Sequence, residues 1–383
     1  MEDWRHGGFG LYLHWPFCQS KCPYCDFNSH VVDQIDPGRW KDAYLFEIRR
    51  AGAETEGRTL DTVFFGGGTP SLMSPDLVSG ILDEVCRVWR TSKSLEVTLE
   101  ANPSSVEAGK FAEFRQAGVN RVSVGVQALN DRDLKLLGRL HSSAEAESAL
   151  EIARSVFDRV SFDLIYARQF QTLASWEREL KRALALADDH LSLYQLTIEE
   201  GTTFGRLFSA GKLRGLPEED LAVDMYLQTQ QICSDKGLFN YEVSNFARPG
   251  AESRHNLTYW RCGDFLGIGP GAHGRLTLNG ARWGYECYKS PSEWLKNVIT
   301  NGNGEKSRSP VPVSEQAEEL LLMGLRLEEG VSLTRLGALH GPQLNTKELL
   351  DLNLITVDDD SLRTTSQGRL LLNSVLEKLT AEI

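Results

Sequence analysis

Short apolar runs that alternate with helix-like stretches constrain the fold of this chain more than any other feature. Six runs rich in apolar and β-branched residues are bounded by turn residues, at 10–15, 61–67, 95–102, 121–127, 161–166 and 190–197. Between two of them, residues 76–90 carry apolar side chains at helical spacing after a Ser-Pro start signal. Alternating strands and helices form parallel βα units. We therefore predict an α/β fold, an incomplete (βα)6 barrel.

Further parts follow the predicted barrel, which we place at residues 1–210. We expect an α+β extension at 211–300, a linker rich in Gly, Asn, Ser and Pro at 301–313, and a small C-terminal domain at 314–383. Helices, a hairpin and a last helix predict a winged-helix-like outline for that domain. From residue 311 onward, twelve Asp and Glu face six Lys and Arg. This balance favours packing or partner docking over DNA binding.

Three of the seven cysteines, Cys18, Cys22 and Cys25, lie within eight residues. The short gaps allow one loop to turn three thiolates toward one centre. Zinc is one candidate, because His14 or His30 could complete the four ligands of a structural zinc site. A four-iron cluster is the other, and with three cysteines it keeps one iron open for a small chelating molecule. The remaining, scattered cysteines are expected to be small buried side chains.

Polar residues stand where several of the predicted strands end. Gly66, Gly67 and Gly68 close one strand, and missing side chains there allow a ligand to approach the backbone. Glu100, Gln127 and Asp163 stand at or near the ends of the next three strands. Parallel sheets collect their ligands at the carboxyl ends of the strands. We therefore expect one polar rim above the three cysteines.

The cysteine motif, with an aromatic residue before its last member, resembles that of the radical S-adenosylmethionine (SAM) superfamily. The resemblance implies a [4Fe-4S] cluster held by Cys18, Cys22 and Cys25, with SAM on the open iron. It also implies that the Gly-Gly-Gly-Thr-Pro element binds the amino group of SAM. The SAM-contacting positions that it implies are Tyr12, Tyr24, Gly67, Gly68, Thr69, Glu100, Gln127, Arg139 and Asp163.

His255 opens the run HNLTYW. Chemistry alone leaves two readings open, a hydrogen-bonded structural histidine and a heme ligand. The run resembles the His-Asn-x-x-Tyr-Trp motif of the heme-chaperone branch of the oxygen-independent coproporphyrinogen III oxidase-like group. That resemblance implies heme binding at His255. If His255 is structural instead, Cys262 and His273 are the next candidates for the heme site. The dehydrogenase branch carries a further cysteine where this chain has Phe27.

The resemblance implies a heme chaperone with a [4Fe-4S] cluster, SAM and heme as cofactors. Its expected partners are acceptor hemoproteins, including membrane-associated respiratory enzymes, and it would be a monomer or a cluster-dependent dimer. The alternative is a radical SAM dehydrogenase that converts coproporphyrinogen III to protoporphyrinogen IX by oxidative decarboxylation. One departure concerns residues 167–172, ARQFQT, where relatives have a Gly-Leu-Pro-Gly turn.

Charge and hydropathy exclude several other classes of protein. The net charge is -12 without a Lys/Arg block, so nucleic acid is not an expected partner. No run approaches the roughly 20 apolar residues of a membrane span. The first residues, MEDWRHGG, lack the apolar region of a signal peptide, and a disulfide framework is not indicated. We expect a cytoplasmic protein.

Overall fold

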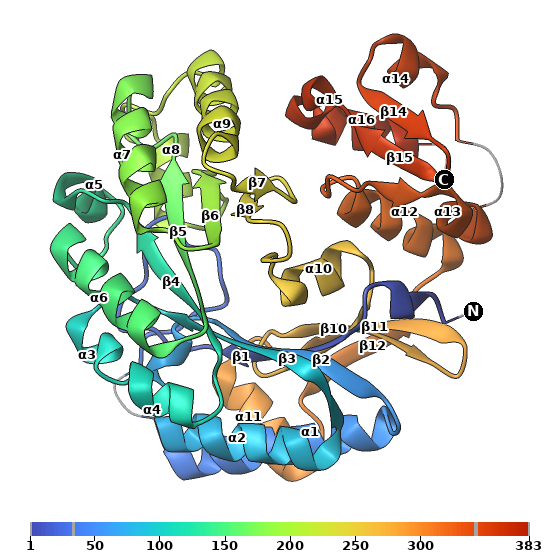
Figure 1. Ribbon diagram of the computed structural model, residues 1–383. Coiled ribbons are helices and arrows are strands. Elements are labelled where there is room, and N and C mark those ends of the chain that lie inside the picture. Colours follow the sequence, from blue (N-terminus) through green and yellow to red (C-terminus); the bar gives the residue numbers. More distant parts are fainter. Residues whose placement is uncertain (1, 33–34, 341–343, 382–383) are drawn as a thin grey trace.

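The computed structural model describes residues 2–32, 35–340 and 344–381. A curved sheet of six successive parallel strands forms its centre (Figure 1). The strands are β1 (Phe9–Trp15), β2 (Thr59–Gly67), β3 (Arg90–Ala101), β4 (Arg121–Gln127), β5 (Arg159–Tyr166) and β6 (His190–Gln195). All six overlap predicted runs, although β3 begins five residues before its run, and the α/β prediction is confirmed.

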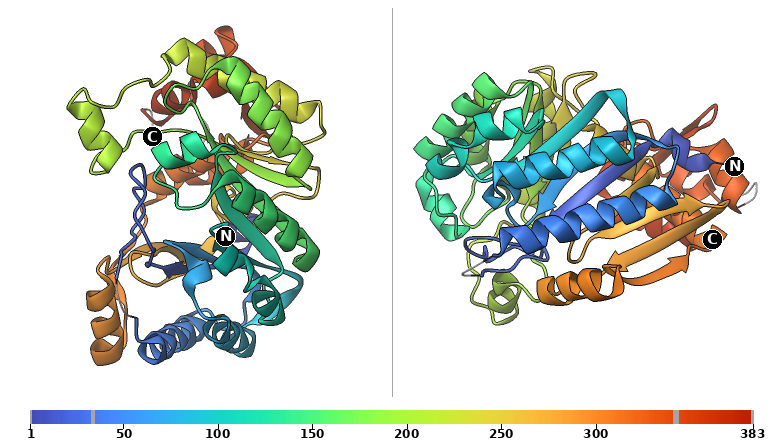
Figure 2. Two further views of the ribbon diagram at one scale, coloured as in Figure 1. Left: turned by 90° about the vertical axis from the view of Figure 1, so that its left-hand side faces the viewer. Right: turned by 90° about the horizontal axis from the view of Figure 1, so that it is seen from below.

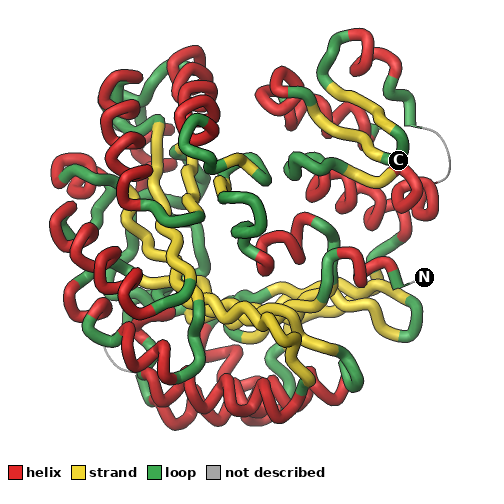
Figure 3. Tube along the Cα trace, viewed as in Figure 1, coloured by secondary structure: helices red, strands yellow, loops and turns green. Residues whose placement is uncertain are grey.

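Helices cover the outer, convex face of this sheet (Figure 3). They are α1 (Pro37–Glu54), α2 (Pro75–Val88), α3 (Ser105–Ala108), α4 (Phe111–Gln116), α5 (Asp131–Leu136), α6 (Ser143–Val156) and α7 (Leu173–Leu186), with 3₁₀ turns at Asp3–His6 and Pro70–Leu72. Local signals set their starts: Ser74 caps α2 by accepting from Leu77 N, and Ser142 forms a capping box with Glu145 on α6. Apolar side chains of helices and strands pack into one continuous core.

The sheet does not close into a barrel. The free edge of β1 pairs with parallel β9, and that of β6 pairs with antiparallel β8, so within the described residues no ladder joins β1 to β6. The prediction of an incomplete barrel is confirmed. The added elements are α8 (Thr203–Ser209), α9 (Glu219–Ser234), β7 (Phe239–Asn240), β8 (Asn245–Ala247), α10 (Arg254–Trp260), β9 (Asp264–Ile268), β10 (His273–Leu278), β11 (Ala281–Cys287) and α11 (Pro291–Asn301).

The segment predicted as a linker, 301–313, instead supplies the last strand of the large sheet. Glu305–Pro310 forms β12, which pairs with antiparallel β11 at the sheet edge. Its side chains are mostly exposed, so it lacks the apolar alternation by which strands are recognised. Backbone pairing and the ion pair between Glu305 and Arg50 (2.8 Å) hold it in place. Figure 2 shows α11, just before β12, beside α1, which also packs on α2.

The last part of the chain has a hydrophobic core of its own. Its elements are α12 (Val313–Gly324), β13 (Val331–Ser332), α13 (Leu333–His340), α14 (Lys347–Asp351), β14 (Ile355–Asp358), β15 (Ser361–Thr364), α15 (Ser366–Leu370) and α16 (Leu372–Thr380). An antiparallel sheet in the order β13-β15-β14 packs with the helices, which gives the winged-helix-like outline. Ion pairs such as Arg335 to Asp3 (2.8 Å) tie this domain to the rest of the chain.

The turn after β5 explains how the ARQFQT departure is accommodated. Ala167 and Phe170 adopt positive φ angles of 56° and 60°. They stand three positions apart, as do the two glycines of the Gly-Leu-Pro-Gly turn that the resemblance leads one to expect. Such a backbone is strained for non-glycine residues. Between them, the Arg168 side chain is 3% exposed and pairs with Asp133 (2.7 Å) and Glu179 (2.5 Å), which fixes the turn against its neighbours.

Candidate functional site

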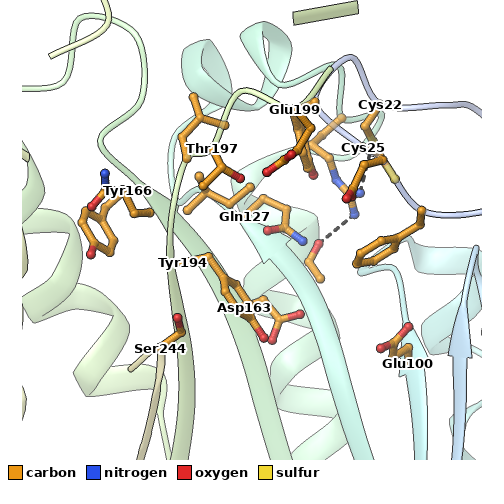
Figure 4. Close-up of a pocket in the computed structure, with 18 of the residues that line it drawn as sticks. Cys22, Cys25, Glu100, Gln127, Asp163, Tyr166, Tyr194, Thr197, Glu199 and Ser244 are labelled. Carbon is orange, nitrogen blue, oxygen red and sulfur yellow. Dashed lines mark hydrogen bonds between the residues drawn. The ribbon is translucent and has the colours of Figure 1, made fainter. Parts of the chain in front are cut away.

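A cavity of about 1190 Å³ opens over the carboxyl ends of the parallel strands. One side is formed by the loop between β1 and α1, which carries the three cysteines. Away from the cysteines, the lining continues on α9 and on residues 369–374 of the C-terminal domain. Figure 4 shows Cys22 and Cys25 beside the strands that carry Gln127 and Asp163. The expected rim residues that the structure brings together here are Cys18, Cys22, Tyr24, Cys25, Gly67, Gly68, Thr69, Glu100, Gln127, Arg139 and Asp163.

The cysteine loop is held by polar contacts to two of the other rim residues. Thr69 Oγ1 donates to Cys18 Sγ at 3.3 Å, and Arg139 Nη1 donates to Cys22 Sγ at 3.5 Å. Burial raises the pKa of the Cys18 and Cys25 thiols above their ordinary value. Both are therefore neutral near pH 7 unless a metal centre holds them as thiolates. Three partly exposed thiols on one loop, with donors to their sulfur atoms, fit an iron-sulfur cluster.

The two histidines considered as a fourth zinc ligand are engaged elsewhere. His14 Nε2 donates to the backbone oxygen of Asn28 at 2.9 Å, and His14 Nδ1 accepts from Tyr12 Oη at 3.1 Å. His30 Nε2 donates to Asn28 Oδ1 at 3.2 Å. Across the described residues, no three His, Cys, Asp or Glu side chains gather around a position for a single ion. With both histidines engaged, the three thiols match a cluster that keeps one iron open better than a zinc site with four protein ligands.

Glycines let the end of β2 pass directly beneath the cysteine loop. Gly67 has a φ of 111°, and a Cβ there would lie 2.6 Å from the ring of His14. A Cβ on Gly68 would lie 2.7 Å from the backbone oxygen of Phe17. Only glycine fits this approach without displacing backbone. The backbone nitrogen of Gly67 donates a hydrogen bond to Glu100 Oε2 at 3.2 Å.

Two carboxyl groups on neighbouring walls of the cavity have raised pKa values. Burial, together with the negative charge of Asp163, raises the pKa of Glu100 to about 8. Burial raises the pKa of Asp163 to about 6, although Ser123 Oγ lies in hydrogen-bond range at 3.4 Å. A ligand that brings a positive charge or hydroxyl donors lowers the cost of ionising both carboxyl groups. SAM carries an ammonium, a sulfonium and ribose hydroxyls, so its chemistry fits these residues.

Sequence reasoning missed one member of this rim, Asn102. Its Oδ1 accepts from Arg139 Nη2 at 2.6 Å, and its Nδ2 donates to Thr69 Oγ1 at 3.3 Å. It therefore joins the arginine to the residue that contacts Cys18. Asn102 directly follows β3, so the strand-end rule could have found it. Gln127, at the end of β4, has a φ of 70° and lies at an irregularity in the ladder with β5.

Tyr12 and His255 lie outside the residues that line the cavity. His255, on α10, is 1% exposed; its Nδ1 shares a hydrogen bond with Thr62 Oγ1 (2.7 Å) and its Nε2 with Tyr259 Oη (2.6 Å). Burial lowers its pKa to about 3, so the imidazole is neutral. Neither ring nitrogen is free to bind iron in this arrangement. The structure therefore supports the interpretation of His255 as a hydrogen-bonded structural histidine.

The two alternative heme ligands are no better placed. Cys262 is 8% exposed, belongs to the core of the C-terminal domain and directs Sγ to the backbone oxygen of Glu319 at 3.7 Å. His273 is exposed at the start of β10, and burial of part of its ring lowers its pKa from the ordinary value. Neither side chain lines the cavity.

The partial barrel with three cysteines over its strand ends is the architecture of radical SAM proteins. The Radical SAM superfamily model matches residues 12–183, and the HemN C-terminal domain model matches residues 311–371. The chain is 40% identical to radical S-adenosyl methionine domain-containing protein 1, mitochondrial, of Bos taurus, over 97% of this chain and 87% of that protein. It is 36% identical to the heme chaperone HemW of Escherichia coli, over 97% of this chain and 98% of that protein.

A solved structure supports the same fold. Coproporphyrinogen III oxidase HemN from Escherichia coli superposes with a TM-score of 0.82, covering 98% of this chain and 91% of that chain at 22% identity. The chain belongs to the radical SAM superfamily, in the HemW branch of the coproporphyrinogen III oxidase-like group. Membership implies a [4Fe-4S] cluster and SAM, as the cavity chemistry does.

Within the described ranges, no helix is long and apolar enough to cross a membrane. The Bos taurus relative carries a mitochondrial name. The cytoplasmic location expected from the sequence therefore stays a prediction.

Replacing Cys18, Cys22 or Cys25 with Ser should remove most of the iron and visible absorbance of the anaerobically reconstituted protein, because each change leaves a second iron without a thiolate. Cys86→Ser is the matched control, since Cys86 is exposed on α2, and it should keep wild-type iron content. Iron and absorbance are measured on the same samples. Wild-type iron in all three loop variants would show that the cluster lies elsewhere.

SAM affinity should rise with pH, by about tenfold from pH 6 to pH 7. In the free protein Glu100 is protonated below its pKa of about 8, and a bound cation favours the ionised form. Calorimetry on the cluster-loaded protein measures this. Glu100→Gln should weaken binding at pH 7 and flatten the pH profile, whereas Glu199→Gln, an exposed carboxylate on the same cavity, should change neither. A flat wild-type profile would contradict the role of Glu100.

Proposed function

We propose that this protein is a heme chaperone that holds a [4Fe-4S] cluster and SAM, binds heme and delivers it to acceptor hemoproteins. The observation that carries the proposal is 36% identity to a protein named heme chaperone HemW over nearly the whole of both chains. Relatives with the same name in Haemophilus influenzae and Bacillus subtilis are 36% and 34% identical over 97% of this chain. The shared length includes the cysteine loop, α10 and the C-terminal domain.

In this proposal SAM binds at the cysteine end of the cavity. Gly67, Gly68 and Thr69 would hold the amino group, and Arg139 would face the carboxylate. Glu100 and Asp163 would take the remaining polar groups, with Gln127 and Tyr24 as further contacts. Tyr12, whose hydroxyl is hydrogen-bonded to His14 outside the cavity lining, is not assigned a contact. When bound, the cluster and SAM supply one-electron chemistry, while this chain positions SAM and limits the access of water.

A row of aromatic rings around His255 suits a planar porphyrin. Phe64 stacks on His255 with ring centroids 4.9 Å apart, and Tyr259 contacts both His255 (4.8 Å) and Phe265 (4.6 Å). All of these rings except that of His255 are partly exposed. Flat apolar ligands bind to such surfaces. Under this proposal His255 becomes an iron ligand when its hydrogen bond to Tyr259 opens.

A coproporphyrinogen III dehydrogenase is the second candidate, favoured by the HemN-like fold. Identity of 22% supports the fold alone. The position two residues after Cys25 argues against this activity, since it holds Phe27 instead of a cysteine, and that side chain is 58% exposed at the cavity. The proposal includes hemoproteins as acceptors, among them membrane-associated respiratory enzymes. It also includes a protein that is a monomer or a cluster-dependent dimer.

Two assays on one reconstituted sample test the proposal. The wild-type protein should bind heme, seen as a Soret band, and should pass it to an apo-hemoprotein within minutes. It should not convert coproporphyrinogen III in the presence of SAM and a strong reductant. Conversion at a rate typical of an enzyme, or a failure to bind heme at micromolar concentration, would overturn the chaperone assignment.

His255→Ala and Tyr259→Phe separate the two readings of His255. If His255 binds iron, His255→Ala should shift the Soret band and weaken heme binding about tenfold or more, because a coordination bond is lost. Tyr259→Phe keeps the ring but frees Nε2, so heme binding should be kept or strengthened. If His255 is structural, both variants keep the wild-type Soret band, and His255→Ala lowers the melting temperature instead, since it leaves a cavity and two unpaired hydroxyls.

A further inference from the structure

The cavity has a second end, formed by the C-terminal domain, whose chemistry differs from that of the cysteine end. Two arginines line it: Arg326, which follows α12, and Arg369 on α15. The nearby apolar side chains are partly exposed on the same cavity, at 40% for Val223, 37% for Leu370 and 47% for Leu371. In Figure 1, α9, which carries Val223, faces the C-terminal domain.

Arg369 is a buried cation with a poorly placed partner. Its side chain is 6% exposed, and its ion-pair partner Glu328, at 2.6 Å, is 67% exposed. An ion pair with a solvated carboxylate contributes little, whereas a buried guanidinium is costly without close acceptors. Arg369 is therefore suited to exchange Glu328 for the anionic group of a ligand in the cavity.

Arg326 also keeps donors for a ligand. It gives Nη2 to Glu242 Oε2 at 3.1 Å and lies over the ring of Trp260 at 4.7 Å. Glu242 in turn accepts from the backbone nitrogen of Ser244 (2.9 Å) and from Asn245 Nδ2 (2.5 Å), so its charge does not depend on Arg326 alone. A guanidinium has five N–H donors, and one such contact leaves several unused.

We propose that Arg326 and Arg369 bind the carboxylate arms of a tetrapyrrole whose apolar ring lies against Val223, Leu370 and Leu371. This inference rests on the proposed function, and it adds residues that hold the anionic edge of the ligand. Guanidinium groups pair with carboxylates through two parallel hydrogen bonds, which fixes orientation as well as affinity. Trp260, beneath Arg326, is the last residue of α10. His255 lies outside the cavity lining, so the inference is independent of the iron-ligand reading of His255.

Other anions fit this end less well. A nucleotide or nucleic acid would need further positive charge, and the C-terminal domain is acidic, with twelve Asp and Glu against six Lys and Arg from residue 311 onward. A free inorganic anion would leave the apolar side chains of this end in water. A ligand with a large apolar body and two carboxylates on one edge matches both the two arginines and the apolar side chains of this end.

The test compares heme with heme dimethyl ester, in which both carboxylates are blocked. The cluster-loaded wild-type protein should bind heme at least tenfold more tightly than the ester. The double variant Arg326→Gln/Arg369→Gln should lose that preference, because its heme affinity falls to the level of the ester. Arg363→Gln, an exposed arginine on β15 of the same domain, is the control and should behave as wild type. SAM affinity should be unchanged in all variants.

The outcomes separate this inference from the proposed function. If wild type binds heme but binds the ester equally well, or if the double variant keeps the preference, the carboxylate site is wrong and the chaperone role stands. If wild type binds neither compound, the proposed function fails and the inference fails with it. Should the double variant not fold, the wild-type comparison still decides, and Arg369→Gln alone, whose lost partner is solvent-exposed, should give part of the effect.

Discussion

The hydrogen bonds between the ends of β1 and β2 are the constraint on which the rest of the site depends. Gly68 N donates to the backbone oxygen of Trp15 at 2.7 Å, and Thr69 N donates to that of Phe17 at 2.9 Å. They extend the parallel ladder past the strands and place Thr69 against Cys18. The lack of side chains at Gly67 and Gly68 makes this approach possible. The positions of the thiols and the shape of the cysteine end of the cavity therefore follow from one backbone arrangement.

The sequence predicts this part of the molecule well because its signals are local. Apolar runs with turn residues define the six strands, and parallel strands must bring their carboxyl ends to one edge. Glu100, Gln127 and Asp163 consequently line one cavity, as expected from their positions alone. Asn102 was missed although it obeys the same rule, because its amide shows no distinguishing pattern in the sequence.

Features that depend on distant contacts could not be predicted. β12 is polar and exposed, and its strand conformation comes from pairing with β11, which no periodicity reveals. The state of His255 depends on Thr62, 193 residues earlier in the chain, which holds Nδ1 inside the core. A motif therefore indicated that His255 matters but could not tell whether its nitrogens are free. Likewise, the positive φ angles of Ala167 and Phe170 depend on the buried ion pairs of Arg168.

The two ends of the cavity differ in which charged groups lack a well-placed partner, and this difference can orient what binds between them. Glu100 and Asp163 at the cysteine end favour a positively charged ligand, since ionising them in the empty site is unfavourable. Arg326 and Arg369 at the other end favour carboxylates. A net charge of -12 gives no sign of this separation, because it averages over the whole surface. SAM and an anionic tetrapyrrole would therefore share one cavity without competing. The carboxyl groups at the cysteine end would hold the cationic groups of SAM, and the arginines at the other end would hold the carboxylates of the tetrapyrrole.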